Sequence, residues 1–170
     1  MIFDKQKIRD KLPHLSKIRF RGEEASWDNT IKLLDTHPEE LINVHPEKLR
    51  YYLKSAHKRP SLEPWAKSVI SNMQTVFHQN EISLIGFLGF GKNTDSYPWH
   101  KDKMDVFLVQ VQGSVNIKVE NTLSEQEPIL FSRGDCVYIP RGTHHHIIPS
   151  ASRVTFSFGV EGELDPSTYV

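Results

Sequence analysis

A succession of short, strand-forming segments fills the second half of this sequence. Between residues 82 and 158, runs rich in valine, isoleucine and phenylalanine alternate with polar turns. The clearest runs are 82–90, 106–111, 114–119, 129–131, 136–139 and 153–158. Many short strands at close spacing are typical of a β-sandwich or barrel. Because only Gln112 and Gly113 separate the second and third runs, these two are predicted to pair as a hairpin.

The first part of the chain carries helical signals instead. Ser26 can cap a helix that reaches Asp35, while Pro38 and Pro46 each suit the first turn of a short helix. Apolar residues recur at helical spacing near the end of this region: Trp65, Val69, Ile70, Met73 and Phe77. We therefore expect a helical N-terminal extension over 1–80, packed on a β core over 81–160, and a tail over 161–170, together forming one structural domain.

Composition limits the kinds of partner. The chain has 170 residues, and 21 basic side chains balance 21 acidic ones, so no charge excess favours nucleic acid or an anionic membrane. Cys136 is the single cysteine, which excludes an internal disulfide. The charged start of the chain lacks the apolar core of a signal peptide, and no apolar run approaches ~20 residues. We expect a cytoplasmic protein, in which the N-terminal helices can cover the barrel, shape a substrate groove or form a homodimer.

One stretch combines residue types that bind metal. His100 and Asp102 are two residues apart, so on a strand both can face one cavity while Lys101 faces water. A single histidine and a carboxylate hold a divalent metal weakly, so a third ligand from a distant strand is needed. The candidate lies beyond the turn at Pro140 and Gly142. Two imidazoles and one carboxylate on one face form the facial triad of non-haem Fe(II) oxygenases.

The turn and the histidines around it match a known pattern. Gly134, Pro140, Gly142 and His145 have the spacing of the second cupin motif, and this match selects His145 among the three consecutive histidines 144–146. Alternation would turn His144 and His146 the other way, although a bulge could bring a neighbour inward instead.

The first cupin motif is matched with two departures. Gly113 lies thirteen residues after His100, as in that motif, but Asp102 replaces its second histidine and Val106 its glutamate. In these departures the sequence resembles the Jumonji-C-type branch of the cupin superfamily. Residues 105–113 are similar to the corresponding strand of the ribosomal oxygenases and of the asparaginyl hydroxylase that inhibits hypoxia-inducible factor.

This resemblance implies a mainly β fold, the double-stranded β-helix, and an activity. It implies an iron- and 2-oxoglutarate-dependent dioxygenase, with Fe(II) bound by His100, Asp102 and His145 as metal ligands and catalytic residues. The substrate would be a peptide or protein side chain or a small molecule, with 2-oxoglutarate as the small-molecule co-substrate.

The residue that binds the far carboxylate of 2-oxoglutarate departs from the pattern. Relatives commonly place a lysine fifteen residues after the first ligand, where this chain has Val115. Arg153 and Thr155 resemble the arginine and hydroxyl pair that binds 2-oxoglutarate in other branches, so we expect them to bind it here. Tyr97 is a further candidate for the same role. The alternative for Arg153 is a surface arginine on an edge strand.

Two other functions stay open at this point. Val115 gives weight to a metal-dependent cupin enzyme that does not use 2-oxoglutarate, such as an isomerase or another dioxygenase. The third hypothesis is a non-catalytic cupin that binds a small ligand, and such a protein would bind no transition metal.

Overall fold

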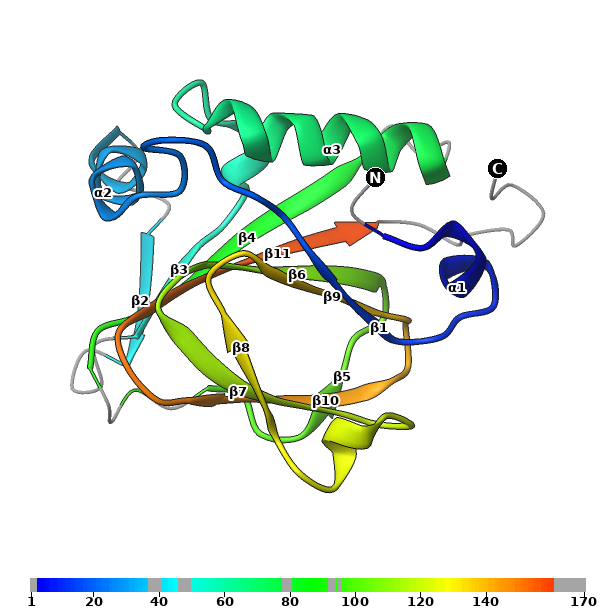
Figure 1. The fold of residues 1–170 in the computed structure, drawn as a ribbon. Helices are drawn as coiled ribbons and strands as arrows, with labels where there is room; N and C mark the ends of the chain where they lie inside the picture. The colour runs from blue at the N-terminus through cyan, green and yellow to red at the C-terminus, as the bar shows by residue number, and fades with distance from the viewer. Residues whose placement is uncertain are drawn as a thin grey trace.

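Two antiparallel sheets face each other across a barrel (Figure 1). The structure is a computed structural model that describes residues 3–36, 41–45, 50–77, 81–91, 94 and 96–160. The larger sheet has the strand order β1-β9-β6-β11-β4-β3-β2, and the smaller sheet has the order β5-β10-β7-β8. This arrangement confirms the predicted mainly β architecture, a double-stranded β-helix with helices packed on one face.

Most strands of the predicted core lie where the sequence pattern places them. They are β4 (Ile82–Gly89), β5 (His100–Lys101), β6 (Asp105–Gln112), β7 (Ser114–Val119), β8 (Ile129–Ser132), β9 (Asp135–Ile139), β10 (His144–Pro149) and β11 (Arg153–Val160). The long strand β11 pairs with β4 on one side and β6 on the other, so it occupies the middle of the larger sheet. Because valine, isoleucine and phenylalanine dominate these segments, both faces of the central strands can be buried.

The helices cover the outer face of the larger sheet (Figure 1). They are α1 (Lys5–Arg9), α2 (Trp27–Thr36) and α3 (Pro64–Phe77). Of two short 3-10 turns, η3 (Ala56–Lys58) lies beside β4 and η4 (Leu123–Glu125) lies beside β7 of the smaller sheet. The predicted cap is confirmed, since the Ser26 hydroxyl accepts a hydrogen bond from the Asn29 backbone N–H at 3.1 Å. Of the predicted apolar stripe of α3, Ile70 is half-buried and the other members are buried: Trp65, Val69, Met73 and Phe77. The Trp65 ring stacks on Phe156 with centroids 5.6 Å apart.

The region expected to be a helical extension also contributes three strands to the larger sheet. They are β1 (His14–Lys17), β2 (Leu41–His45) and β3 (Arg50–Leu53). Pro38 and Pro46 lie outside the described residues, so the short helices expected there stay a prediction. β3 gains a ladder of backbone hydrogen bonds on the edge of β4, and this pairing outweighs a weak local preference for helix in a region expected to be helical.

The predicted hairpin around Gly113 was wrong. β6 pairs with β9 and β11 in the larger sheet, whereas β7 pairs with β8 and β10 in the smaller one. Gly113 has φ +68°, and a Cβ there would overlap the carbonyl oxygen of Ser152. The glycine therefore lets the chain cross from one sheet to the other at a close backbone approach.

The described residues form two apolar cores. One lies between the larger sheet and the helices, and the other lies inside the barrel, where Val115, Ile117 and Phe131 pack with Val106 and Leu108. Because strands from both sides of residue 80 share one sheet, the first core joins the two predicted regions. The division at residue 80 stays a prediction, and the predicted tail 161–170 lies outside the described residues. None of the described helices has the length and apolar character needed to cross a membrane.

Candidate metal centre

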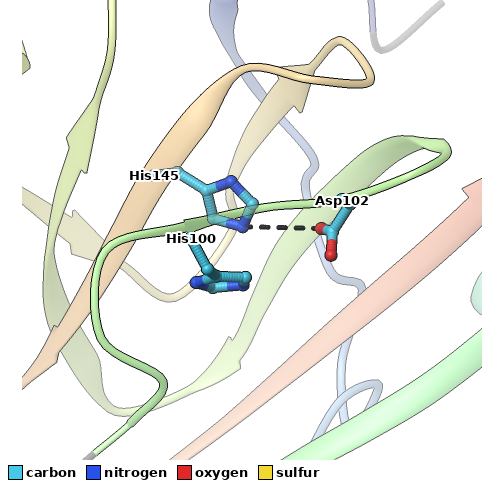
Figure 2. Close-up of side chains that lie close together, drawn as sticks. All are labelled: His100, Asp102 and His145. Atoms are coloured by element: carbon cyan, nitrogen blue, oxygen red, sulfur yellow. Dashed lines mark ion pairs between the residues drawn. The ribbon is translucent and has the colours of Figure 1, made fainter.

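Strand pairing brings three potential metal ligands together (Figure 2). His145 on β10 lies directly opposite His100 on β5, so both imidazoles emerge on the same face, and their centroids are 4.3 Å apart. Asp102 follows β5 by one residue, and its Oδ2 lies 3.5 Å from Nε2 of His145. One nitrogen or oxygen atom from each of the three residues lies within 4.8 Å of the other two.

Hydrogen bonds orient both imidazoles for metal binding. Nδ1 of His100 lies 2.7 Å from the carbonyl oxygen of Pro98, and Nδ1 of His145 lies 3.2 Å from that of Thr143. A carbonyl only accepts, so Nδ1 of each ring carries a proton, and in the neutral ring this leaves the lone pair on Nε2. Such outer hydrogen bonds fix the ring and the tautomer of metal-binding histidines.

Burial favours the neutral form of His145. Its side chain is 4% exposed, and this burial, followed by the charge of His100, lowers the pKa of His145. A histidine must lose its proton at Nε2 to bind a metal, so a lowered pKa keeps the ring ready for an ion at neutral pH.

The neighbouring histidines lie on the opposite face of β10. Nδ1 of His144 is 3.0 Å from Glu120 Oε2, and its ring lies parallel to Trp99 with centroids 6.2 Å apart. His146 pairs in register with Lys118, whose ammonium donates to the Gln126 carbonyl at 3.2 Å. Among the described residues, the structure thus brings His145 and not its neighbours to His100 and Asp102.

The three side chains face a cavity of about 410 Å³ inside the barrel. His145 and Ile147 line it from the smaller sheet, and strands β3, β4, β6 and β11 line it from the larger sheet. The described lining residues are Arg50, Tyr52, Lys54, Ile85, Phe87, Leu88, Ser96, Tyr97, Pro98, His100, Asp102, Met104, Val106, Leu108, His145, Ile147, Arg153, Thr155 and Ser157. A small molecule in this cavity would contact the candidate ligands directly.

Arg153 lies on the cavity wall that the larger sheet provides. It is 3% exposed on a central strand, so the alternative of a surface arginine on an edge strand was wrong. Its Nη1 donates to the Thr94 hydroxyl at 2.5 Å. A Cβ on Gly89, the residue opposite on β4, would lie 2.5 Å from Nη1, so this glycine makes room for the guanidinium.

The other predicted co-substrate residues have distinct surroundings. Thr155 also lines the cavity, but its hydroxyl donates to Gln110 Oε1 at 2.7 Å. Tyr97 is 43% exposed, and its ring centroid lies 5.4 Å from that of His100. Val115, at the position where relatives have a lysine, is fully buried in the apolar core of the barrel and supplies no cation.

The sequence prediction missed the contribution of β3 to the cavity. Arg50 and Tyr52 on this strand, and Lys54 directly after it, all line the cavity. The alternation of these three residues at period two was the available signal, but this part of the chain was expected to be helical.

Comparisons with known proteins bear on the fold. No family model matches the sequence, and neither does any curated protein. A solved structure of YcfD, a ribosomal oxygenase from Escherichia coli, superposes with a TM-score of 0.69 at 15% identity, over 95% of this chain and 52% of YcfD. The structure of YcfD in complex with cobalt and 2-oxoglutarate gives 0.66 at 15% identity, over 89% of this chain and 48% of that one. This chain therefore spans about half the length of the YcfD structures, and the likeness confirms the predicted cupin-type fold.

Proposed function

We propose that this chain is an Fe(II)- and 2-oxoglutarate-dependent oxygenase that hydroxylates a peptide or protein side chain or a small molecule. The observation that carries the proposal is one cavity with His100, Asp102 and His145 on one side and the buried Arg153 on the other. The fold shared with YcfD is consistent with this arrangement.

The donor set suits iron. Two neutral imidazoles and a carboxylate are the ligands that non-haem Fe(II) oxygenases use, and a set of three leaves other coordination positions open. When bound, the iron would activate dioxygen beside the co-substrate and the substrate. His100 and His145 would bind through Nε2, because Nδ1 of each ring faces a backbone carbonyl.

Arg153 would bind the far carboxylate of 2-oxoglutarate. A guanidinium presents a planar fork that matches a carboxylate with two parallel hydrogen bonds. The existing bond from Nη1 to Thr94 orients this fork in the cavity. Thr155 can add a donor only by turning its hydroxyl away from Gln110.

An anaerobic titration tests the proposal. Purified protein receives Fe(II) and then 2-oxoglutarate, and the visible charge-transfer band of the iron chelate is followed. We expect the band in the wild type, and we expect Arg153→Gln to weaken 2-oxoglutarate binding about tenfold or more, since it removes a charge-assisted pair. Lys118→Gln removes a cation outside the cavity and serves as the control, with unchanged binding.

A cupin-type metal enzyme that does not use 2-oxoglutarate is the second candidate, and the buried Val115 favours it. Binding of iron without the chelate band, together with turnover that needs no 2-oxoglutarate, would replace the first proposal by this one. A wild-type protein that binds no transition metal would leave a ligand-binding cupin instead. The cytoplasmic location and the homodimer stay predictions.

A further inference from the structure

The turn at residues 140–143 is fastened to the segment that carries one of the candidate metal ligands. The Gly142 backbone N–H donates to the carbonyl oxygen of Asp102 at 2.9 Å, and the Arg141 backbone N–H donates to Asp105 Oδ1 at 2.8 Å. Asp102 and Asp105 are three residues apart, so one short segment accepts from two consecutive N–H groups of the turn. These two contacts fix the position of the turn relative to Asp102.

The same turn determines where the ring of His145 points. The Thr143 carbonyl oxygen lies 3.2 Å from Nδ1 of His145, and this contact orients the ring. Thr143 is itself part of the turn, because its backbone N–H donates to the Pro140 carbonyl oxygen at 3.1 Å. A displaced turn would carry the Thr143 carbonyl with it, and Nε2 of His145 would no longer face the other two ligands.

Asp105 holds the turn from outside the cavity. Its carboxylate has no exposed surface, and Asp105 is not among the described residues that line the cavity. A metal ion or a substrate in the cavity would therefore not touch this side chain. Any effect of Asp105 on the metal centre has to pass through the turn.

The two carboxylate oxygens of Asp105 have different partners. Oδ2 accepts a hydrogen bond from Lys11 Nζ at 2.7 Å, whereas Oδ1 accepts from the Arg141 backbone N–H and lies 3.8 Å from Nε of the Arg141 side chain. Lys11 lies between α1 and β1, so Oδ2 contacts the N-terminal segment and Oδ1 contacts the turn. The ammonium of Lys11 compensates the buried charge, and each contact can be removed without the other.

Loss of the contact at Oδ1 would release the turn. A buried N–H without an acceptor is costly, so the backbone would shift until the Arg141 N–H found another partner. The ligands of a metal site have to be held within about 0.5 Å of their productive geometry. Groups that orient a ligand from outside change metal affinity by about 10- to 100-fold when they are removed. A small shift of the turn is therefore enough to weaken the site.

We propose that Asp105 is a positioning residue for the candidate metal centre. By accepting a hydrogen bond from the Arg141 N–H, its carboxylate holds the turn in the place where His145 meets His100 and Asp102. This role rests on the proposed function, since it concerns the same metal centre, but it does not require 2-oxoglutarate.

Titration with Co(II) tests this role, because the visible absorption of bound Co(II) reports the number and arrangement of its ligands. The metal is added to metal-free protein at a temperature where circular dichroism shows that each variant is folded. We expect Asp105→Ala to weaken Co(II) binding about tenfold or more and to alter the absorption spectrum. Lys11→Met removes the ammonium but leaves Oδ1 on the turn, so Co(II) affinity should stay within about threefold and the spectrum should not change.

Two further variants separate positioning from stability. Asp105→Asn keeps an oxygen that can accept from the Arg141 N–H, so it should retain more Co(II) affinity than Asp105→Ala. If Asp105→Ala does not fold, Lys11→Met combined with Asp105→Leu takes its place, because apolar side chains often replace a buried ion pair without loss of stability. The combined variant still lacks the acceptor for the turn, and it should bind Co(II) about tenfold more weakly than the wild type.

Three outcomes would remove Asp105 from this role. In the first, Asp105→Ala, or the combined variant in its place, binds Co(II) like the wild type. In the second, Lys11→Met weakens Co(II) binding as much as Asp105→Ala does, and the carboxylate then contributes to stability alone. In the third, the wild type binds no Co(II). Failure of the proposed function is recognised separately: Co(II) binding that depends on Asp105, in a protein that forms no iron chelate with 2-oxoglutarate, would sustain the positioning role without the oxygenase.

Discussion

At the scale of single residues, the chemistry of the candidate centre depends on which atoms face inward. His145 is buried with Nε2 directed at Asp102, while His144 pairs with Glu120 on the outer face. Strand alternation produces this difference between neighbours of identical type. The two histidines therefore form a matched pair for testing the metal site.

We expect His145→Ala to weaken Fe(II) binding by about two orders of magnitude or more, because loss of an outer-shell partner alone costs about 10- to 100-fold. His144→Ala removes an imidazole from the other face and should leave Fe(II) affinity within about threefold. Anaerobic equilibrium dialysis followed by iron analysis measures both. Equal losses in the two variants would contradict the assignment of His145.

Gly89 allows a test of Arg153 that leaves the arginine itself in place. In Gly89→Ala the new Cβ would lie 2.5 Å from Arg153 Nη1 and 2.7 Å from the Thr94 hydroxyl, so the guanidinium must move. We expect 2-oxoglutarate affinity to fall about tenfold while Fe(II) affinity is kept. Gly86→Ala in the same strand is the control, since its Cβ would make ordinary contacts of 3.4 Å or more. Unchanged co-substrate affinity in Gly89→Ala would argue against the role of Arg153.

At the scale of elements, β1 ties the N-terminal segment to the barrel. His14 on β1 packs between Phe3 and Tyr138, and its Nε2 accepts a hydrogen bond from the Asp4 backbone N–H at 3.1 Å. Asp4 is also the N-cap of α1. Because Nε2 must be unprotonated to accept, the contact between β1 and α1 requires a neutral ring.

Burial lowers the pKa of His14 below its ordinary value of 6.5, and this sets the sign of a pH effect. As pH falls through 6.5, the unfolded chain takes up a proton that the folded chain resists, so the free energy of unfolding decreases. We expect His14→Gln to lose less stability than the wild type between about pH 7.5 and pH 5.5. Urea unfolding of metal-free protein at both pH values measures this loss of stability. His145, whose pKa is also lowered, is present in the wild type and in the variant and contributes equally to the loss in each. An equal loss in wild type and variant would contradict the prediction.

At the scale of the whole molecule, one buried carboxylate joins the N-terminal segment, the barrel and the turn before His145. Asp105 has no exposed surface, and it accepts hydrogen bonds from Lys11 Nζ at 2.7 Å and from the Arg141 backbone N–H at 2.8 Å. A buried charge is tolerated when such partners compensate it, and removing one partner leaves the other charge unsatisfied.

We expect Asp105→Ala to lower the free energy of unfolding by about 3 kcal/mol or more. The control is the pair of Lys17 and Asp135, 2.9 Å apart, in which the lysine side chain is 82% exposed, and Lys17→Ala should cost less than about 1 kcal/mol. Denaturant unfolding monitored by tryptophan fluorescence compares the two variants. Similar costs for both would mean that Asp105 does not couple these parts of the molecule.

The β core and the names of the candidate ligands could be read from the sequence, because both depend on local spacing. Period-two runs predict strands whichever partners those strands pair with in the fold. The spacing along the chain does not depend on the rest of the fold either, and it singles out His100, Asp102, Pro140 and His145. The structure then brings the three ligand residues together through one pair of opposed positions on β5 and β10.

Tertiary structure alone decided which distant segments meet. The segment 50–53 becomes a strand because the edge of β4 offers backbone partners, and 41–45 pairs in turn with 50–53. β6 and β7 separate because each has other strands to pair with. Alternation shows that Arg50, Tyr52 and Lys54 share a face, but only the pairing of β3 with β4 turns that face toward the cavity. Local preferences differ by a fraction of a kcal/mol per residue, so the supply of hydrogen-bond partners and buried surface from remote parts of the chain outweighs them.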